Sequence, residues 1–255
     1  MVAAAGYDYW EPPVAAVAPG QDEQVFAAAR RRFQELPLRP EAWNCLLPGD
    51  LKITGPDVDA AGVDRYLKAA FDRIAELGGR VVVFGSGRAR AVPDGFDRTQ
   101  AEKQIASFLR RAGDAAAARD LIMAIEPLNR RECNIINSVA EGLAMAQRVD
   151  HERVRLLADS YHMFQDDEPL SNLAEAGGAL VHIHIADRPR NAPAEGAEEL
   201  GPFFSALRAV GYDGRISIEC RWGDDFEREL RRAREFLLRL WAEADSPAAA
   251  SAPAS

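Results

Sequence analysis

Four residues with metal-binding side chains each lie at the end of a short apolar run in the second half of the chain. They are Glu126 in LIMAIEPLN, Asp159 in VRLLADSYH, His184 in VHIHIAD and Glu219 in RISIEC. Two Glu, one Asp and one His form an oxygen-rich ligand set with one imidazole, which favours manganese, magnesium, cobalt or iron over a thiolate-selected metal. Each carboxylate alone could cap a helix and the histidine could be a hydrogen-bonded core residue, but the repetition at four successive runs favours a metal site.

The same residues could move a proton next to a carbonyl group. Such a transfer passes through an enediolate, and a divalent ion stabilises its developing charge as a Lewis acid. Glu126 and Glu219, the first and last ligands along the chain, are the predicted acid/base pair. One removes the proton and the other returns it to the opposite face, which inverts the carbon; return to the adjacent carbon would give aldose–ketose isomerisation.

These residues would share one location if the apolar runs were parallel strands. Short apolar segments alternate with longer amphipathic ones, which predicts strands separated by helices and hence a parallel sheet. The expected strands are 7–11, 39–46, 80–84, 121–126, 154–159, 179–186 and 215–220. The expected helices are 21–35, 58–77, 99–119, 138–149, 171–176, 201–210 and 226–244. In a parallel barrel the carboxyl ends of the strands carry the chemistry, so the four candidate ligands would meet there.

The predicted fold class is α/β, a (β/α)₈ TIM barrel in which the first strand is lacking or truncated. The 255 residues suit one eight-stranded barrel, yet seven strands are recognisable and the chain opens on AAAGYDYWE, which resembles a helix end running into a second strand. Composition does not change along the chain, so residues 1–245 are predicted to form a single barrel domain. The segment SPAAASAPAS predicts a disordered tail over 246–255.

Composition and charge restrict the partners. The chain is 47% hydrophobic and 28% charged with a net charge of −9, which is typical of a soluble globular protein and unfavourable for nucleic-acid binding. The arginines of 228–234 alternate with glutamates, which predicts a solvated helix face. The three distant cysteines indicate reduced thiols, and the sequence shows neither a secretory signal nor a membrane-length apolar run. We therefore expect a cytoplasmic protein without a nucleic-acid or membrane partner.

At the candidate ligands the chain resembles the xylose isomerase-like barrel superfamily, and within it the ketose 3-epimerases and related sugar isomerases. IEPLNRRECNIIN is similar to a strand-five signature, ADSYHM to a strand-six motif and HIHIADRPR to a strand-seven motif. The resemblance implies that Glu126, Asp159, His184 and Glu219 bind a divalent ion, Mn²⁺ first and Mg²⁺ or Co²⁺ as alternatives. It also implies that Glu132, His162 and Arg190 contact the substrate.

The activity implied is that of a sugar isomerase or epimerase that moves a proton next to the carbonyl of a ketose through a cis-enediolate. Its partner would be a small-molecule sugar, and such barrels are compatible with homo-oligomers. The substrate contacts have simpler alternatives: Arg190 could pair with Asp187, His162 could cap the following helix, and Glu132 could be plain surface. The segment FGSGRARAVPDGFD, residues 84–97, also resembles family members, but the sequence assigns it no role.

Other reactions on the same scaffold stay open at this point. Inosose-type dehydratases, hydroxypyruvate isomerases and C-glycoside-cleaving subunits would use a similar metal site. A non-catalytic barrel subunit is the alternative from another class of protein; the four candidate ligands oppose it and the missing first strand favours it. A metal-dependent abasic-site endonuclease would need more ligands and a basic surface, which four histidines and a net charge of −9 argue against.

Overall fold

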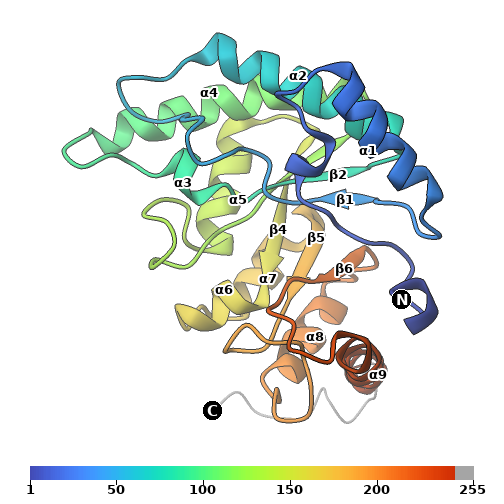
Figure 1. Cartoon of the computed structure of the whole chain (residues 1–255). Helices are drawn as coiled ribbons and strands as arrows, with labels where there is room; N and C mark the ends of the chain where they lie inside the picture. The colour runs from blue at the N-terminus through green and yellow to red at the C-terminus, as the bar shows by residue number, and fades with distance from the viewer. Residues whose placement is uncertain (245–255) are drawn as a thin grey trace. The chain divides into compact units, whose positions relative to one another are not determined.

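The structure is a computed structural model in which residues 1–244 are described, and these form two compact units (Figure 1). The first unit is Tyr9–Leu157, and the second combines Met1–Asp8 with the residues from Ala158 onward. The tail expected over 246–255 lies outside the described residues. The single barrel domain expected over 1–245 stays a prediction.

The first unit is a parallel α/β arrangement. Its strands are β1 (Ala42–Trp43), β2 (Val81–Phe84), β3 (Ile122–Ile125) and most of β4 (Val154–Asp159). They pair in parallel and in chain order, with Ala42 opposite Val81, Val81 opposite Ile122 and Met123 opposite Val154. Its helices are η2 (Val14–Val17), α1 (Glu23–Glu35), α2 (Ala60–Glu76), α3 (Gly87–Arg90), α4 (Arg98–Ala117) and α5 (Val139–Val149).

Local sequence explains these elements. The strands are short apolar runs, and Val82, Val83 and Phe84 are fully buried, as expected of a parallel sheet covered on both faces. The long helices begin at residues whose side chains accept a backbone N–H of the first turn: Asp22, Asp59, Asp97 and Ser138. Gly78 follows the last residues of α2 with φ of 81°, a left-handed conformation that ends the helix.

The second unit contains β5 (Leu180–Ile185) and β6 (Arg215–Ile218), which pair in parallel with His184 opposite Ser217. Its helices are η1 (Ala3–Ala5), α6 (Ser160–Gln165), α7 (Ser171–Ala176), η3 (Gly177–Ala179), α8 (Leu200–Ala209) and α9 (Phe226–Ala244). Helices α8 and α9 pack together and bury Phe203, Phe204 and Leu230. The N-terminal residues pack on α9, where the Tyr7 hydroxyl donates to the Leu230 carbonyl at 2.9 Å.

The segment 7–11, expected as a strand, forms only isolated parallel bridges. Trp10 pairs with Pro40, and Pro13 pairs with Asn44. Pro12 and Pro13 lack the N–H groups that would continue a ladder, so the prediction of a strand here is wrong. The described residues therefore contain six strands where seven were predicted. The short helices α3 and α6 were also not expected.

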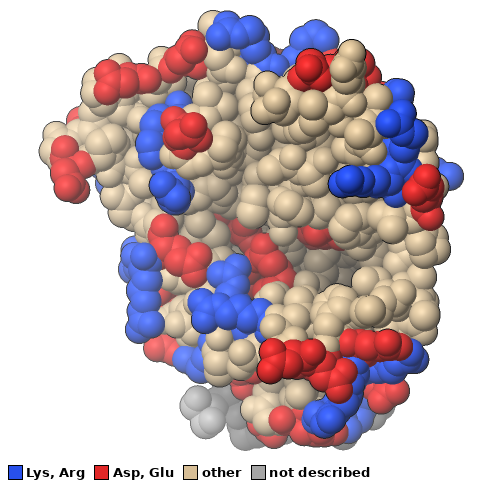
Figure 2. Space-filling model, in the orientation of Figure 1, with Lys and Arg blue, Asp and Glu red and all other residues tan. Residues whose placement is uncertain are grey.

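Charged side chains lie mixed on the surface. On the face that Figure 2 shows, Lys and Arg side chains lie among Asp and Glu side chains. On α9, Arg231 pairs with Glu227 at 2.5 Å, and the neighbouring Arg228 and Arg232 are exposed. The predicted solvated face of this helix is thus confirmed. Among residues 1–244, no helix has the length and apolar character needed to cross a membrane.

Candidate metal and catalytic site

Three of the four predicted ligands come together in the second unit. Asp159 ends β4, His184 lies near the end of β5, and Glu219 follows β6. Each offers a ligand atom, and these atoms all lie within 4.8 Å of one another. Donor atoms bound at about 2.0–2.2 Å to one ion lie at most ~4.4 Å apart, so atoms up to 4.8 Å apart would need to close by only a few tenths of an ångström around a divalent ion, and the oxygen and nitrogen donors suit such an ion.

Backbone hydrogen bonds place these ligands. The Glu219 amide donates to the Ile185 carbonyl at 3.1 Å, which continues the β5–β6 pairing past the last strand residue. The Ser160 hydroxyl donates to the Ala186 carbonyl at 3.0 Å and accepts from the Ala186 amide at 3.1 Å. The ends of β4, β5 and β6 are therefore fixed independently of the carboxylates and the imidazole.

Asp159 combines two roles. One carboxylate oxygen accepts from the Tyr161 amide at 2.8 Å and caps α6. The other oxygen lies 3.6 Å from Nε2 of His162, and both side chains are almost completely buried. A helix cap by His162 was considered as an alternative to substrate contact. The cap of α6 is made instead by Asp159, and it uses one of the two Asp159 carboxylate oxygens.

Arg190 reaches the ligand group. Its guanidinium lies 2.8 Å from the Glu219 carboxylate and 4.5 Å above the centre of the Tyr161 ring. The Arg190 backbone has φ of 67°, and its carbonyl accepts from the Arg221 amide at 2.7 Å. Asp187, the alternative partner, accepts from the Asn191 amide at 2.5 Å. The guanidinium is thus placed where it could orient both Glu219 and a bound molecule.

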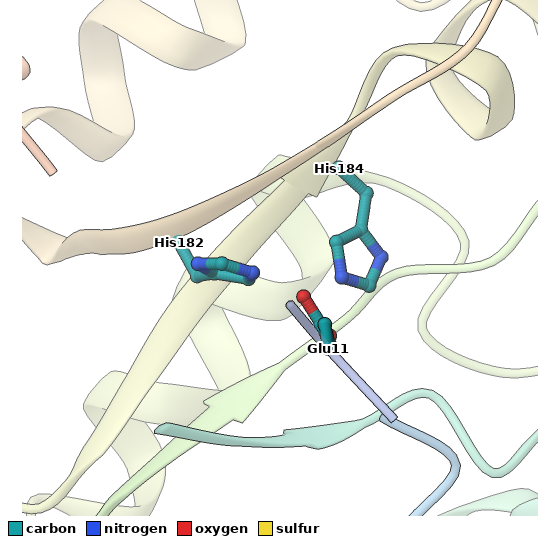
Figure 3. A group of neighbouring side chains, drawn as sticks. All are labelled: Glu11, His182 and His184. Atoms are coloured by element: carbon teal, nitrogen blue, oxygen red, sulfur yellow. The ribbon is translucent and has the colours of Figure 1, made fainter. Parts of the chain in front are cut away.

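His182 lies deeper on the same strand as His184. Figure 3 shows the two rings side by side on β5, and their centres are 5.2 Å apart. His182 Nε2 lies 3.2 Å from the Ser217 hydroxyl, and the ring is fully buried. His182 is therefore a core residue of this unit.

The thiol next to Glu219 stays protonated. Burial, with a smaller contribution from the carboxylates of Glu229, Asp187 and Glu219, raises the pKa of Cys220 to about 12. Thiolate, not thiol, binds metals. The candidate ligand group in this unit, Asp159, His184 and Glu219, offers oxygen and nitrogen donors.

Glu126 and Glu132 lie in the first unit. Glu126 follows β3 directly, its amide donates to the Phe84 carbonyl at 3.2 Å, and its side chain is 5% exposed. A Cβ on Gly85 would lie 2.0 Å from the Glu126 carboxylate, so this carboxylate needs glycine beside it. Glu132 is exposed six residues further on, and its carboxylate accepts from the side-chain Nδ2 of Asn129 at 3.0 Å.

Three residues around these groups were not found by sequence reasoning. Gly85 makes room for Glu126, Tyr161 stacks under Arg190, and Arg90 binds the backbone next to Glu126. The only signals were the glycines of GSGRAR and the aromatic residue after Asp159. Neither of these two signals indicates which residue would be contacted.

Parallel strands that alternate with helices and carry carboxylates and an imidazole at their ends define an α/β barrel protein with a candidate metal site. The family described as xylose isomerase-like TIM barrel matches residues 1–240, and the chain belongs to this family. The expected family resemblance is confirmed. So is the fold class, a TIM barrel lacking or truncated at its first strand.

The relatives are sugar epimerases. The chain is 30% identical to the L-ribulose 3-epimerase of Methylomonas sp. (strain DH-1) over 249 residues, 95% of this chain and 84% of the relative. It is also 30% identical to the 3-dehydro-D-guloside 4-epimerase of Escherichia coli (strain K12), over 62% of each chain. The structure of a Methylomonas D-allulose 3-epimerase with D-allulose superposes with a TM-score of 0.79 and 25% identity, covering 93% of this chain and 88% of that one. The expectation of an enzyme of the isomerase class is confirmed.

Proposed function

We propose that this chain is a divalent-metal-dependent ketose 3-epimerase. The observation that carries the proposal is the convergence of Asp159, His184 and Glu219, with ligand atoms within 4.8 Å, in a chain related to 3-epimerases. Glu126 is the proposed fourth ligand. Its support is its burial and its position at the end of β3, which matches the family's strand-five signature.

The bound ion, Mn²⁺ first and Mg²⁺ or Co²⁺ as alternatives, would supply Lewis-acid stabilisation of negative charge on the sugar oxygens. Glu126 and Glu219 are the acid/base pair. One carboxylate takes the proton from C3 of the ketose and leaves a cis-enediolate, and the other carboxyl group gives a proton to the opposite face. The C3 centre is thereby inverted with no net change in atoms.

Glu132, His162 and Arg190 orient the sugar in this proposal. His162 is supported by its position 3.6 Å from Asp159, and Arg190 by its 2.8 Å contact with Glu219. Glu132 has weaker support, since it is exposed and its visible partner is Asn129. Donors and acceptors held in place lower the entropic part of the barrier by fixing the reacting carbon against its base.

The proposal also includes the expected partner, location and oligomeric state of the protein. The partner is a small-molecule sugar, with a cytoplasmic location, no nucleic-acid or membrane partner, and a homo-oligomer compatible with the fold. The mixed charge pattern in Figure 2 supports the lack of a nucleic-acid surface on the face in view. The relatives favour an epimerase over a dehydratase, hydroxypyruvate isomerase, C-glycoside-cleaving subunit or non-catalytic barrel.

A second candidate is epimerisation at C4 of a 3-keto sugar. It is favoured by the 30% identity to the 3-dehydro-D-guloside 4-epimerase. The chemistry is the same, because C4 also lies next to the carbonyl carbon. Only the position of the carbonyl in the substrate differs.

A metal-reconstitution assay tests both candidates. The purified protein is stripped with EDTA, reloaded with Mn²⁺, Mg²⁺ or Co²⁺, and incubated with free ketoses and with 3-keto glycosides. We expect a C3 epimer of at least one ketose, no product from the stripped protein, and loss of both metal binding and product in Asp159→Asn. Turnover of 3-keto glycosides alone would favour the 4-epimerase, and equal turnover without metal would refute both.

A further inference from the structure

Arg90 is a fully buried arginine in the segment 84–97, to which the sequence assigned no role. It ends the short helix α3, and its side chain has no exposed surface. Removal from water lowers the pKa of this guanidinium, which reflects the unfavourable free energy of a charge in this position. A buried cation is unfavourable unless hydrogen bonds satisfy its donors, so the partners of this guanidinium indicate its role.

The guanidinium joins three backbone segments. It donates to the Phe84 carbonyl at the end of β2 at 2.9 Å, to the Glu126 carbonyl at 2.8 Å, and to the Ile136 carbonyl at 3.3 Å. It also lies 5.3 Å from the centre of the Phe84 ring. One planar group therefore fixes the exits of two neighbouring strands and the far end of the loop that begins at Glu126.

Both peptide groups that flank the Glu126 Cα are hydrogen-bonded. Its amide donates to the Phe84 carbonyl at 3.2 Å, and its carbonyl accepts from Arg90. The Glu126 carboxylate fills the space that Gly85 leaves. Because both peptide groups are fixed and the carboxylate lies in this space, a shift of the Glu126 backbone would carry the carboxylate with it.

The loop after Glu126 is strained and clamped. Ile136 has φ of 57°, a conformation that β-branched residues rarely adopt, so surrounding contacts must maintain it. Arg90 binds its carbonyl, which also accepts from the Leu128 amide at 3.1 Å. The Asn137 side chain donates to the Leu128 and Cys133 carbonyls at 2.7 Å each.

We propose that Arg90 is a positioning residue that sets the place of the Glu126 carboxylate through the Glu126 main chain. It touches neither substrate nor metal. The inference rests on the proposed function, in which Glu126 is a ligand and an acid/base. Displacement of a reacting group by about 1 Å can lower a rate by about 100-fold, so loosening this clamp would affect turnover more than binding of the sugar.

The variant Arg90→Lys tests the role, because an ammonium group cannot donate to three carbonyls in one plane. Arg73 offers a matched control. It is 9% exposed, and its guanidinium donates to the Val17 carbonyl at 3.0 Å, to the Ala18 carbonyl, and to the Gln21 carbonyl at 2.9 Å. Arg73 therefore clamps loops in the same way, with no candidate ligand attached.

Both variants are compared with the wild type in three measurements. Electron paramagnetic resonance gives the Mn²⁺ affinity, steady-state kinetics give kcat and KM, and urea denaturation gives the free energy of unfolding. We expect Arg90→Lys to weaken Mn²⁺ binding and lower kcat by about tenfold or more with little change in KM. Arg73→Lys should lose stability yet keep affinity and kcat within about twofold of the wild type. If Arg90→Lys does not fold, the neutral Arg90→Gln replaces it. Equal effects of the two positions on affinity and kcat would overturn the inference.

A double-mutant cycle tests whether Arg90 acts through Glu126. In a Glu126→Gln background, Arg90→Lys should change Mn²⁺ affinity little, because the group that it positions has already lost its charge. A full additive loss in that background would contradict the proposal.

Hydrogen exchange separates the failure of this inference from the failure of the proposed function. Amides of Glu126 and Leu128 should lose protection in Arg90→Lys and keep it in Arg73→Lys. If the wild type neither binds Mn²⁺ nor converts any ketose, the proposed function is wrong while this exchange pattern still tests the clamp. Unchanged protection in Arg90→Lys would overturn the clamp itself.

Discussion

The carboxylate of Glu126 depends on the absence of a side chain at position 85. A Cβ at Gly85 would lie 2.0 Å from the Glu126 carboxylate, closer than real contacts allow. We predict that Gly85→Ala displaces this carboxylate and lowers kcat by about tenfold or more. Gly178→Ala is the control, since a Cβ there meets nothing within 4 Å. Steady-state kinetics of the two variants measure the effect, and an unimpaired Gly85→Ala enzyme would contradict the dependence of the Glu126 carboxylate on Gly85.

Tyr161 supports Arg190 from below. The guanidinium lies 4.5 Å above the ring, a cation–π contact of about 1 kcal/mol. Tyr161→Leu should therefore lower kcat/KM by about fivefold, while Tyr161→Phe, which keeps the ring, should leave it nearly unchanged. Equal losses in both variants would mean that the hydroxyl group, rather than the ring, is what matters.

At the level of elements, helix positions could be predicted from the sequence to within a few residues, because caps and apolar spacing are local signals. The helix expected over 99–119 is α4, Arg98–Ala117, and that over 226–244 is α9 without change. The strand expected over 7–11 does not form, because Pro12 and Pro13 lack the N–H groups that a ladder of backbone hydrogen bonds requires. Helix α6 was missed because Asp159 was interpreted as a ligand, whereas it also caps a helix.

Some residues of the candidate site could likewise be predicted from the sequence, and others could not. The positions of the candidate ligands could be predicted because each lies at or just after the end of an apolar strand. The role of Arg90 could not be predicted, because its partners are backbone carbonyls 6, 36 and 46 residues away. Every residue has a backbone carbonyl, so the sequence does not indicate which ones a side chain will bind. The same holds for the stack of Arg190 on Tyr161, which depends on the turn that follows β5.

The cap of α4 provides a test of stability without a role in the proposed chemistry. The Asp97 carboxylate accepts from the Gln100 amide at 2.7 Å. We predict that Asp97→Ala lowers the free energy of unfolding by about 1 kcal/mol and leaves kcat unchanged, because the first turn of the helix loses its acceptor. Asp97→Asn should be nearly neutral, as asparagine also caps helices. Urea unfolding monitored by circular dichroism gives both values, and a loss of stability in Asp97→Asn alone would contradict the cap.

Two partly buried acids, Tyr66 and Cys220, contribute to the pH dependence of stability of the whole molecule. Burial raises the pKa of Tyr66 and of Cys220 to about 12 each, from 10.0 and 9.0. The unfolded chain therefore loses these protons first, so the stability that these two groups contribute is fully present below pH 9 and is lost as the pH rises towards 12. Tyr66→Phe, which has no proton to lose, should lessen the fall between pH 10 and 12. Urea unfolding at several pH values measures it, and an unchanged slope would mean that Tyr66 is not buried as described.

The central claim is that Glu126 and Glu219 exchange a proton with the carbon next to a ketose carbonyl. The most direct test is incubation of the Mn²⁺-loaded protein with a panel of ketoses in deuterated water, followed by NMR of the sugars. We predict deuterium at C3 of both the remaining substrate and its epimer, dependent on metal and lost in Glu126→Gln and Glu219→Gln. No exchange into any ketose by a folded protein that binds Mn²⁺, or full exchange in either variant, would contradict the account.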